Sequence, residues 1–223
     1  MIGIVVPAHN EEAALPDCLE ALARAACHEA LAGEAVRIAV VLDACDDGSR
    51  RVVLDHGARA RTSLVALTVD ARNVGVARAA GAAWLVEAGA RWLAFTDADT
   101  HVAPDWLSAQ LALDVDAVCG SVGVTGWGLH SPSVRAAYES QYDDADGHRH
   151  VHGANLGVST AAYLLAGGFE PLPCREDVAL VDALTRHGAR IAWSAKPRVT
   201  TSARRVFRAR GGFGDYLLSL QAR

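Results

Sequence analysis

The sequence lacks the patterns that mark several common protein classes. The apolar run at residues 2–6 is not followed by Gly-x-Gly-x-x-Gly, so the phosphate-binding turn of a dinucleotide-dependent dehydrogenase is missing. The five cysteines are odd in number and include no Cys-x-x-Cys pair, which argues against a disulfide framework and against a zinc site. No window reaches the roughly 18 apolar residues of a membrane-spanning helix, and the apolar start is too short for a signal peptide. We therefore expect a soluble, cytoplasmic protein without an integral membrane segment.

Positive charge is also scarce, since the formal net charge is -5. Nucleic-acid binding generally needs a basic face, so we expect no nucleic-acid partner, although the arginines near residues 204–210 form a local basic stretch. The chain has 223 residues, of which 51% are hydrophobic. This is enough for one large α/β domain with a substantial core, and we expect a single domain over residues 1–223.

The order of apolar and polar segments predicts an α/β fold. Up to about residue 125, short β-rich runs alternate with longer helical patterns, which predicts a mainly parallel sheet with helices on both faces. After residue 125 the rhythm changes, and we expect a shorter mixed half that shares the same core, with the site at the seam between the halves. The predicted strands are 2–6, 36–42, 62–69, 91–96 and 116–124, and the predicted helices are 12–27, 48–56, 74–89, 104–113, 132–146 and 176–188.

Two carboxylates one residue apart, Asp97 and Asp99, follow the apolar run 91–95 and flank Ala98. Ligands of open α/β sheets lie beyond the carboxyl ends of the strands, so this pair is placed to hold a hard divalent cation, which commonly holds a phosphate. The pair alone is weak evidence, because acids after a strand also form solvated turns or cap the next helix, and Pro104 does begin a helical stretch.

Two other strand ends carry polar groups toward the same edge. Pro7, Asn10 and Glu11 follow the first strand, and they form either a nucleotide-contacting loop or an ordinary acidic helix start. Asp43 ends the second strand, early enough to accept hydrogen bonds from a base or ribose, whereas Asp46 is typical of a helix cap.

A third segment, 71–81, opens a helix whose glycines and alanines allow the close approach of a backbone or ligand. It begins with Asn73 and carries Arg78, for which the alternative is a solvated helix face.

Two further segments carry side chains whose role the sequence leaves open. His148, His150 and His152 alternate, so an extended chain puts them on one face, where they could bind a metal, line an acceptor site or lie in solvent. His152 is the nearest of the three to the expected site. Arg204 and Arg205 precede a Gly-Gly turn, as in a lid that closes over a diphosphate, but a solvated tail or one drawn to an anionic membrane surface fits as well.

In order and spacing, these segments resemble the inverting family-two glycosyltransferases of the GT-A fold, in which Val-Val-Pro-x-x-Asn-Glu, an Asp after strand two and an Asp-x-Asp after strand four build the nucleotide-sugar site. The resemblance covers about residues 1–205, and the turn 167–169 followed by Glu176 and Asp177 is similar to the family's acceptor-side turn and Glu-Asp pair. It departs from the family at Asp-Ala-Cys-Asp-Asp, residues 43–47, and at the histidine-rich stretch.

The resemblance implies a three-layer α/β/α, Rossmann-like fold of the nucleotide-diphospho-sugar transferases, with a mainly parallel mixed sheet. Residues 1–125 would bind the nucleotide-sugar, and residues 126–223 would form an acceptor half with a basic lid. Asp43 would contact uracil or guanine, Asp97 the ribose or metal, Asp99 the metal and diphosphate, and Asp177 would be the catalytic base. His152 is a third metal-ligand candidate. The remaining nucleotide-sugar residues would be Pro7, Asn10, Glu11, Asn73, Arg78, Ala98, Arg204 and Arg205.

The chemistry of sugar transfer needs these residue types. Mg²⁺ or Mn²⁺ held by carboxylates stabilises the departing diphosphate, and a positioned carboxylate removes the proton of the acceptor hydroxyl. We therefore expect a metal-dependent, inverting transferase that uses a UDP- or GDP-sugar and an unidentified hydroxyl acceptor, which could be a glycan, a lipid carrier, a peptide or a small metabolite, with peripheral contact at the inner membrane face left open.

Three alternatives remain open. One is a non-catalytic nucleotide-sugar binding homologue, and another is a retaining transferase of the same fold. A sugar nucleotidyltransferase is disfavoured, because the loop after the first strand lacks a glycine-rich triphosphate loop with a basic residue.

Overall fold

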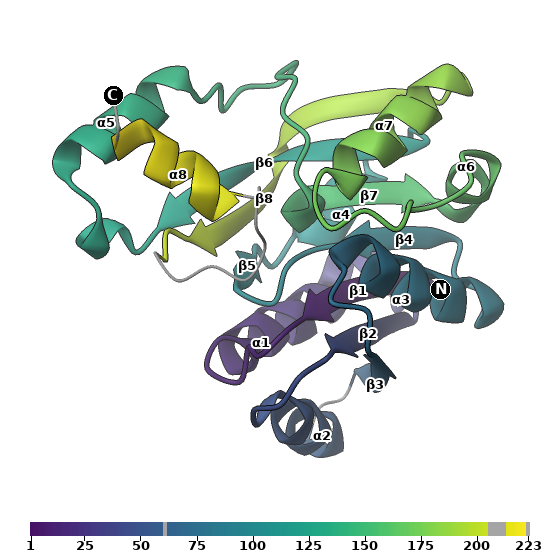
Figure 1. Cartoon of the computed structure of the whole chain (residues 1–223). Coiled ribbons are helices and arrows are strands. Elements are labelled where there is room, and N and C mark those ends of the chain that lie inside the picture. Colours follow the sequence, from purple (N-terminus) through teal and green to yellow (C-terminus); the bar gives the residue numbers. More distant parts are fainter. Residues whose placement is uncertain (60–61, 205–212, 222–223) are drawn as a thin grey trace.

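Parallel strands that are buried on both faces form the centre of the molecule. The computed structural model describes residues 1–59, 62–204 and 213–221, and within them one eight-stranded sheet runs in the order β3-β2-β1-β4-β7-β6-β8-β5 (Figure 1). The strands are β1 (Ile2–Ala8), β2 (Val36–Asp43), β3 (Ser63–Val69), β4 (Trp92–Phe95), β5 (Thr100–Val102), β6 (Ala117–Thr125), β7 (Leu156–Ser159) and β8 (Ile191–Ser202).

Helices cover both faces of this sheet. The α-helices are α1 (Leu15–Ala26), α2 (Ser49–Arg59), α3 (Val74–Glu87), α4 (Trp106–Leu111), α5 (Pro132–Gln141), α6 (Thr160–Leu165), α7 (Glu176–Arg186) and α8 (Phe213–Gln221), and the short 3-10 turns are Glu29–Leu31, Trp127–Leu129 and Gly153–Asn155. One core joins α1, α2 and α4 to strand residues such as Ile4, and the opposite core joins α3 and α7 to residues such as Phe95. No helix among the described residues is long and apolar enough to cross a membrane.

The strand order creates a crevice at one edge of the sheet. β1 pairs in parallel with β2 on one side and with β4 on the other. The chain therefore moves outward from β1 to β2 and β3, then returns to the other side of β1 with β4. This is a topological switch point, where the loops after the strands separate and ligands of open α/β sheets bind.

The second half is mixed and closes the sheet on the far side of β4. β7 is antiparallel to both β4 and β6, β8 is parallel to β6, and β5 is antiparallel to β8. The buried Asn155 side chain joins these elements, because its amide nitrogen donates to the carbonyls of Ser121 and Pro197 and its oxygen accepts from the Trp106 indole at 2.8 Å. Pro197 lies in an irregular part of β8, where the ladder to β6 is interrupted and no N–H is required.

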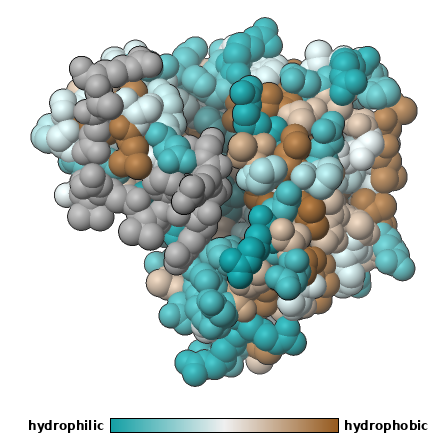
Figure 2. Space-filling view, viewed as in Figure 1, coloured by the Kyte–Doolittle hydropathy of each residue, from teal (hydrophilic) through white to brown (hydrophobic). Residues whose placement is uncertain are grey.

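A small separate core holds α5 against α8. It contains Val134, Tyr138, Leu217 and Leu220, and the two helices lie side by side in Figure 1. In the view of Figure 2, hydrophilic side chains run down the middle of the molecule, between the part that carries α5 and α8 and the part that carries α1 to α3.

The predicted three-layer α/β class with a mainly parallel mixed sheet is confirmed. Two predicted helices were too long by at least three residues at one end. The first begins at Leu15 rather than residue 12, with Pro16 in its first turn, and α5 ends at Gln141 rather than residue 146, where Tyr142 turns extended. The prediction missed three strands and two helices, which are β5, β7, β8, α6 and α8.

Candidate active site

Loops after β1 and β2 are clasped together at the edge of the sheet. Asn10 and Asp46 exchange two hydrogen bonds, one from the Asn10 amide to the Asp46 carboxylate at 2.6 Å and one from the Asp46 backbone N–H to the Asn10 side chain at 2.9 Å. Asn10 and Ala44 have positive φ angles of 55° and 49°, which is uncommon for residues other than glycine. Pro7 lies in β1 directly before this clasp. The loops therefore hold a defined, strained shape.

The Asp43 carboxylate fixes the loop that precedes α3. It accepts three backbone hydrogen bonds of 2.7–2.8 Å, from Ala71, Arg72 and Asn73, and its residue is only 4% exposed. The Asn73 side chain caps α3 by accepting from the Val76 N–H, and its amide donates to the Pro171 carbonyl at 2.9 Å. Asp43 and Asn73, both predicted to contact a nucleotide, thus also shape the loop.

Asp97 shares a buried arginine with a glutamate from the other half of the chain. The Arg78 guanidinium, on α3, donates to the Asp97 carboxylate and to the Glu176 carboxylate at the start of α7. Arg78 and Glu176 are almost fully buried, whereas the Asp97 side chain is 37% exposed. Burial raises the pKa of Glu176, although the Arg78 charge opposes the rise. The Asp97 carboxylate is therefore partly exposed toward the crevice, while Arg78 contacts it from the buried side.

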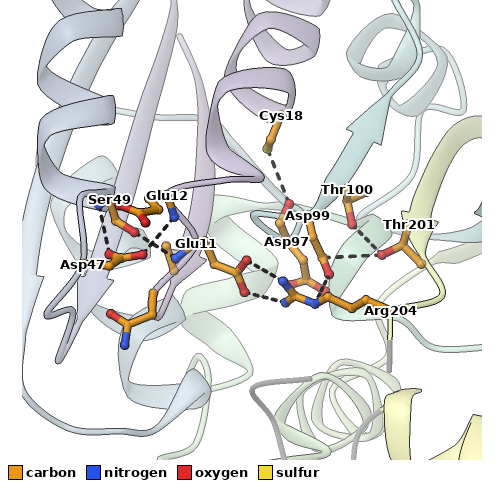
Figure 3. Close-up of polar contacts among 12 residues, drawn as sticks. Glu11, Glu12, Cys18, Asp47, Ser49, Asp97, Asp99, Thr100, Thr201 and Arg204 are labelled. Atoms are coloured by element: carbon orange, nitrogen blue, oxygen red, sulfur yellow. Dashed lines mark hydrogen bonds and ion pairs between the residues drawn. The ribbon is translucent and has the colours of Figure 1, made fainter. Parts of the chain in front are cut away.

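Asp99 shares a second arginine with a second glutamate. Figure 3 shows Arg204, just beyond β8, in contact with both Glu11 carboxylate oxygens and with Asp99. Its Nε atom lies 3.2 Å from an Asp99 carboxylate oxygen. The Thr201 hydroxyl also approaches Asp99, from β8. A pocket of about 250 Å³ adjoins this contact and is lined by Asp99, Arg204, Ala14, His101, Thr125, Thr200 and Ser202. Glu11 and Arg204 are 193 positions apart in sequence and meet here.

The charges around this pair of acids suit a divalent cation. Burial raises the pKa of Asp99 to about 6; Arg204 opposes this rise, and the charges of Asp97 and Glu11 add to it. Among the described residues, Arg78 bridges Asp97 and Glu176, and Arg204 bridges Glu11 and Asp99. Mg²⁺ is commonly held by one or two carboxylates together with substrate phosphates, so a pair of protein ligands fits such a site.

Asp177 lies one residue after Glu176, and backbone hydrogen bonds orient it. One of its oxygens accepts from the Gly153 N–H at 2.7 Å, and the other accepts from the Val178 N–H at 2.8 Å. Gly153 packs so closely on Arg78 that a Cβ at this position would lie 2.0 Å from the guanidinium. The Gly153 backbone therefore contacts both the Asp177 carboxylate and the Arg78 guanidinium.

The three alternating histidines do lie on one face, as predicted, although not in a regular strand. The rings of His148 and His150 are 5.5 Å apart and those of His150 and His152 are 5.8 Å apart, both in stacked orientation. Tyr142 stacks on His150 at 4.3 Å, and its hydroxyl lies 3.1 Å from His152 Nε2. Burial, then the neighbouring histidines, lowers the pKa of His152 to about 4. The lowered pKa favours the neutral form of the His152 ring.

The structure brings most of the predicted residues to one edge of the sheet, including Pro7, Asn10, Glu11, Asp43, Asn73, Asp97, Ala98, Asp99 and Arg204. Ala98 is buried between the two acids. Among the described residues there is no group of three or more His, Cys, Asp or Glu side chains placed to hold a metal, and the role of His152 as a metal ligand stays a prediction. Arg205 lies outside the described residues.

Sequence reasoning missed Thr201, Gly153 and the bridging role of Glu176. Of these three, only Glu176 could have been found from the sequence, because it is the neighbour of the predicted base Asp177.

Comparison with known proteins assigns this architecture. A three-layer α/β fold with an Asp-x-Asp at the switch point is the design of the GT-A nucleotide-sugar transferases. The sequence model of "Glycosyl transferase family 2" matches residues 3–160, and the chain belongs to this family. No curated protein matches the chain in sequence.

Solved structures share the fold at low sequence identity. S. aureus TarS 1-349 in complex with UDP-GlcNAc is 16% identical with a TM-score of 0.72, over 99% of this chain and 65% of that one. The mannosyltransferase PcManGT from Pyrobaculum calidifontis, in complex with GDP-Man and Mn²⁺, is 17% identical with a TM-score of 0.68, over 94% and 58%. GalNAc-T7 with UDP, GalNAc and Mn²⁺ is 14% identical with a TM-score of 0.67, over 95% and 44%. The chain thus spans less than two thirds of the length of these structures.

Proposed function

We propose that the protein is a metal-dependent glycosyltransferase that moves a sugar from a UDP- or GDP-sugar to a hydroxyl acceptor, with inversion at the anomeric carbon. The observation that carries this proposal is the pair of acids Asp97 and Asp99 at the switch point of the sheet, with Arg204 beside Asp99. Family membership and the nucleotide-sugars bound to TarS and PcManGT support the donor class.

In this proposal the crevice binds the donor from several sides. Pro7, Asn10, Glu11, Asp43 and Asn73 line the nucleoside end, where the clasped loops and the Asp43 hydrogen bonds provide a preformed shape. Asp97 and Asp99 hold Mg²⁺ or Mn²⁺, which would stabilise the charge of the departing diphosphate. Arg204 lies beside Asp99 and is positively charged, so it can exchange carboxylate contacts for phosphate oxygens.

Asp177 serves as the base. Its two backbone hydrogen bonds fix the carboxylate, and each oxygen keeps a further lone pair to accept the proton of the acceptor hydroxyl. A base on the acceptor side allows attack opposite the leaving diphosphate, which inverts the anomeric centre. A positioned general base typically contributes about 10²–10⁴-fold to the rate.

Calorimetric titration of UDP and GDP, with Mn²⁺ and with EDTA, tests the donor site. We expect one nucleotide to bind when Mn²⁺ is present, and Asp99→Ala to abolish that metal-dependent binding. Asp105→Ala is the matched control, because Asp105 is exposed and makes no capping hydrogen bond at α4. Absence of nucleotide binding in the wild type, or metal-dependent binding that survives in Asp99→Ala, would contradict the proposed site.

Release of nucleoside diphosphate from UDP-GlcNAc or GDP-mannose tests the base, with water in place of the unidentified acceptor. Asp177→Asn should bind the nucleotide as the wild type does but release it at least about 100-fold more slowly. Asp182→Asn, an exposed change on the same helix α7, should have no effect. Normal turnover by Asp177→Asn would refute the assignment of the base.

A further inference from the structure

Arg78 is a buried cation that connects the two halves of the site. Its side chain is 3% exposed, and its guanidinium reaches Asp97 at the end of β4 and Glu176 at the start of α7. Burial opposes its charge, but Asp97 and Glu176 together raise the pKa of Arg78, so it remains protonated. The two partners are 79 residues apart in sequence, which makes Arg78 the direct link between the strand that precedes the acid pair and the helix α7, which begins at Glu176 and carries Asp177.

The surroundings of Arg78 leave it no path to a nucleotide. The Gly153 backbone packs against one edge of the guanidinium, and the Phe169 ring centroid lies 5.9 Å from its central carbon. Its Nε atom is buried without a hydrogen-bond partner. The guanidinium is thus enclosed by protein, which favours an indirect role for Arg78 over the predicted contact with the nucleotide-sugar.

We infer that Arg78 is a positioning residue that sets the geometry between the metal-holding acid Asp97 and the base Asp177. This inference rests on the proposed function. The planar fork of arginine satisfies two carboxylates at once in fixed directions. One arm orients Asp97, and the other anchors Glu176, whose neighbour Asp177 is held by the same Gly153 backbone that covers Arg78.

Two substitutions disturb this bridge in different ways. Arg78→Lys keeps the charge but has a single point of contact, so it cannot hold both carboxylates in the same geometry. Gly153→Ala keeps Arg78 intact, yet its Cβ would overlap the guanidinium and force it to move. Misplacement of reacting groups by about 1 Å can cost about 10²-fold in rate, which sets the expected scale of both effects.

The test measures binding and turnover separately at saturating Mn²⁺. For Arg78→Lys and Gly153→Ala we expect the Kd of UDP or GDP to stay within about threefold of wild type, while kcat for nucleotide release from the donor falls about 10–100-fold. The controls are Arg186→Lys, an exposed change on α7, and Gly128→Ala, where a Cβ meets no atom within 4 Å. Both should behave as the wild type, and thermal unfolding reports whether each variant is folded.

The outcomes separate this inference from the proposed function. A Kd that rises in parallel with the loss of kcat would make Arg78 a nucleotide ligand, and unchanged kcat in both variants would remove the positioning role. Either result overturns the inference while the wild type remains a transferase. A wild type that neither binds nucleotide nor releases it from a donor overturns the proposed function, and the role of Arg78 with it.

Discussion

Removal of the Asp43 carboxylate should destabilise the protein whether or not it binds a nucleotide. Asp43→Ala leaves the N–H groups of Ala71, Arg72 and Asn73 without their acceptor. The Arg72 backbone has a φ of 48°, an uncommon conformation that these hydrogen bonds help to hold. We therefore expect the loop before α3 to relax and the free energy of unfolding to fall.

The magnitude follows from the environment of the three donors. A hydrogen bond to a charged group contributes about 1.5–3 kcal/mol, and an abandoned buried donor costs a similar amount. Ala71 and Arg72 are exposed, so water can reach their N–H groups once the loop relaxes, and the lower end applies. At about 1.5 kcal/mol for each of the three bonds, the expected loss is about 4–5 kcal/mol. Asp43→Asn should lower the free energy of unfolding by less, because the amide oxygen of Asn can still accept two of the three hydrogen bonds.

Urea unfolding measures this loss as a shift of the midpoint at constant slope. Asp46→Ala is the control, since Asp46 lies three residues after Asp43, in the loop after β2, but is exposed. This substitution should lower the free energy of unfolding by less than about 1 kcal/mol. A loss below about 1 kcal/mol for Asp43→Ala, or equal losses for the two variants, would refute the view that this carboxylate organises the loop.

Two other predictions concern the histidines and the packing of α3. Because the pKa of His152 is lowered from 6.5 to about 4, the unfolded chain takes up a proton that the folded protein excludes. Stability should therefore fall by about 3 kcal/mol as the pH drops from about 6.5 to about 4. His152→Phe should flatten this part of the pH dependence of urea unfolding; parallel curves would contradict it. Gly75→Ala should cost about 2–3 kcal/mol, because its Cβ would lie 2.2 Å from the Glu170 carbonyl oxygen, which is backbone and cannot easily move. Urea unfolding beside Gly128→Ala checks this prediction, and a loss as small as that of Gly128→Ala would count against it.

The first half of the fold could be predicted from the sequence because its signals are local. Parallel strands that are buried on both faces appear as continuous apolar runs, such as residues 2–6 and 91–95, and the acids that follow them must lie at the same edge. Asp43 and Asp97 were found in this way. Their hydrogen-bond partners were not predicted, because three of those of Asp43 are backbone N–H groups that leave no trace in residue identity.

The second half could not be predicted because its elements depend on distant partners. β5 has three residues and is a strand only through its pairing with β8. The polar end of β8, Thr200–Ser202, was not predicted to be a strand, since no local pattern shows that β5 and β6 lie on either side of it. The pairing of Glu11 with Arg204 likewise joins residues far apart in sequence.

The late position of Arg204 has a consequence for synthesis on the ribosome. The parallel pairings of β1, β2, β3 and β4 with one another are complete by residue 95, so they can form while the rest of the chain is still being made. Asp97 then emerges after its partner Arg78, whereas Asp99 emerges about a hundred residues before Arg204. The nascent protein therefore holds Asp99 close to Glu11 without Arg204 until the residues after β8 have been added. Glu11→Gln should ease the folding of a ribosome-bound chain that stops before residue 191 and do the opposite in the finished protein.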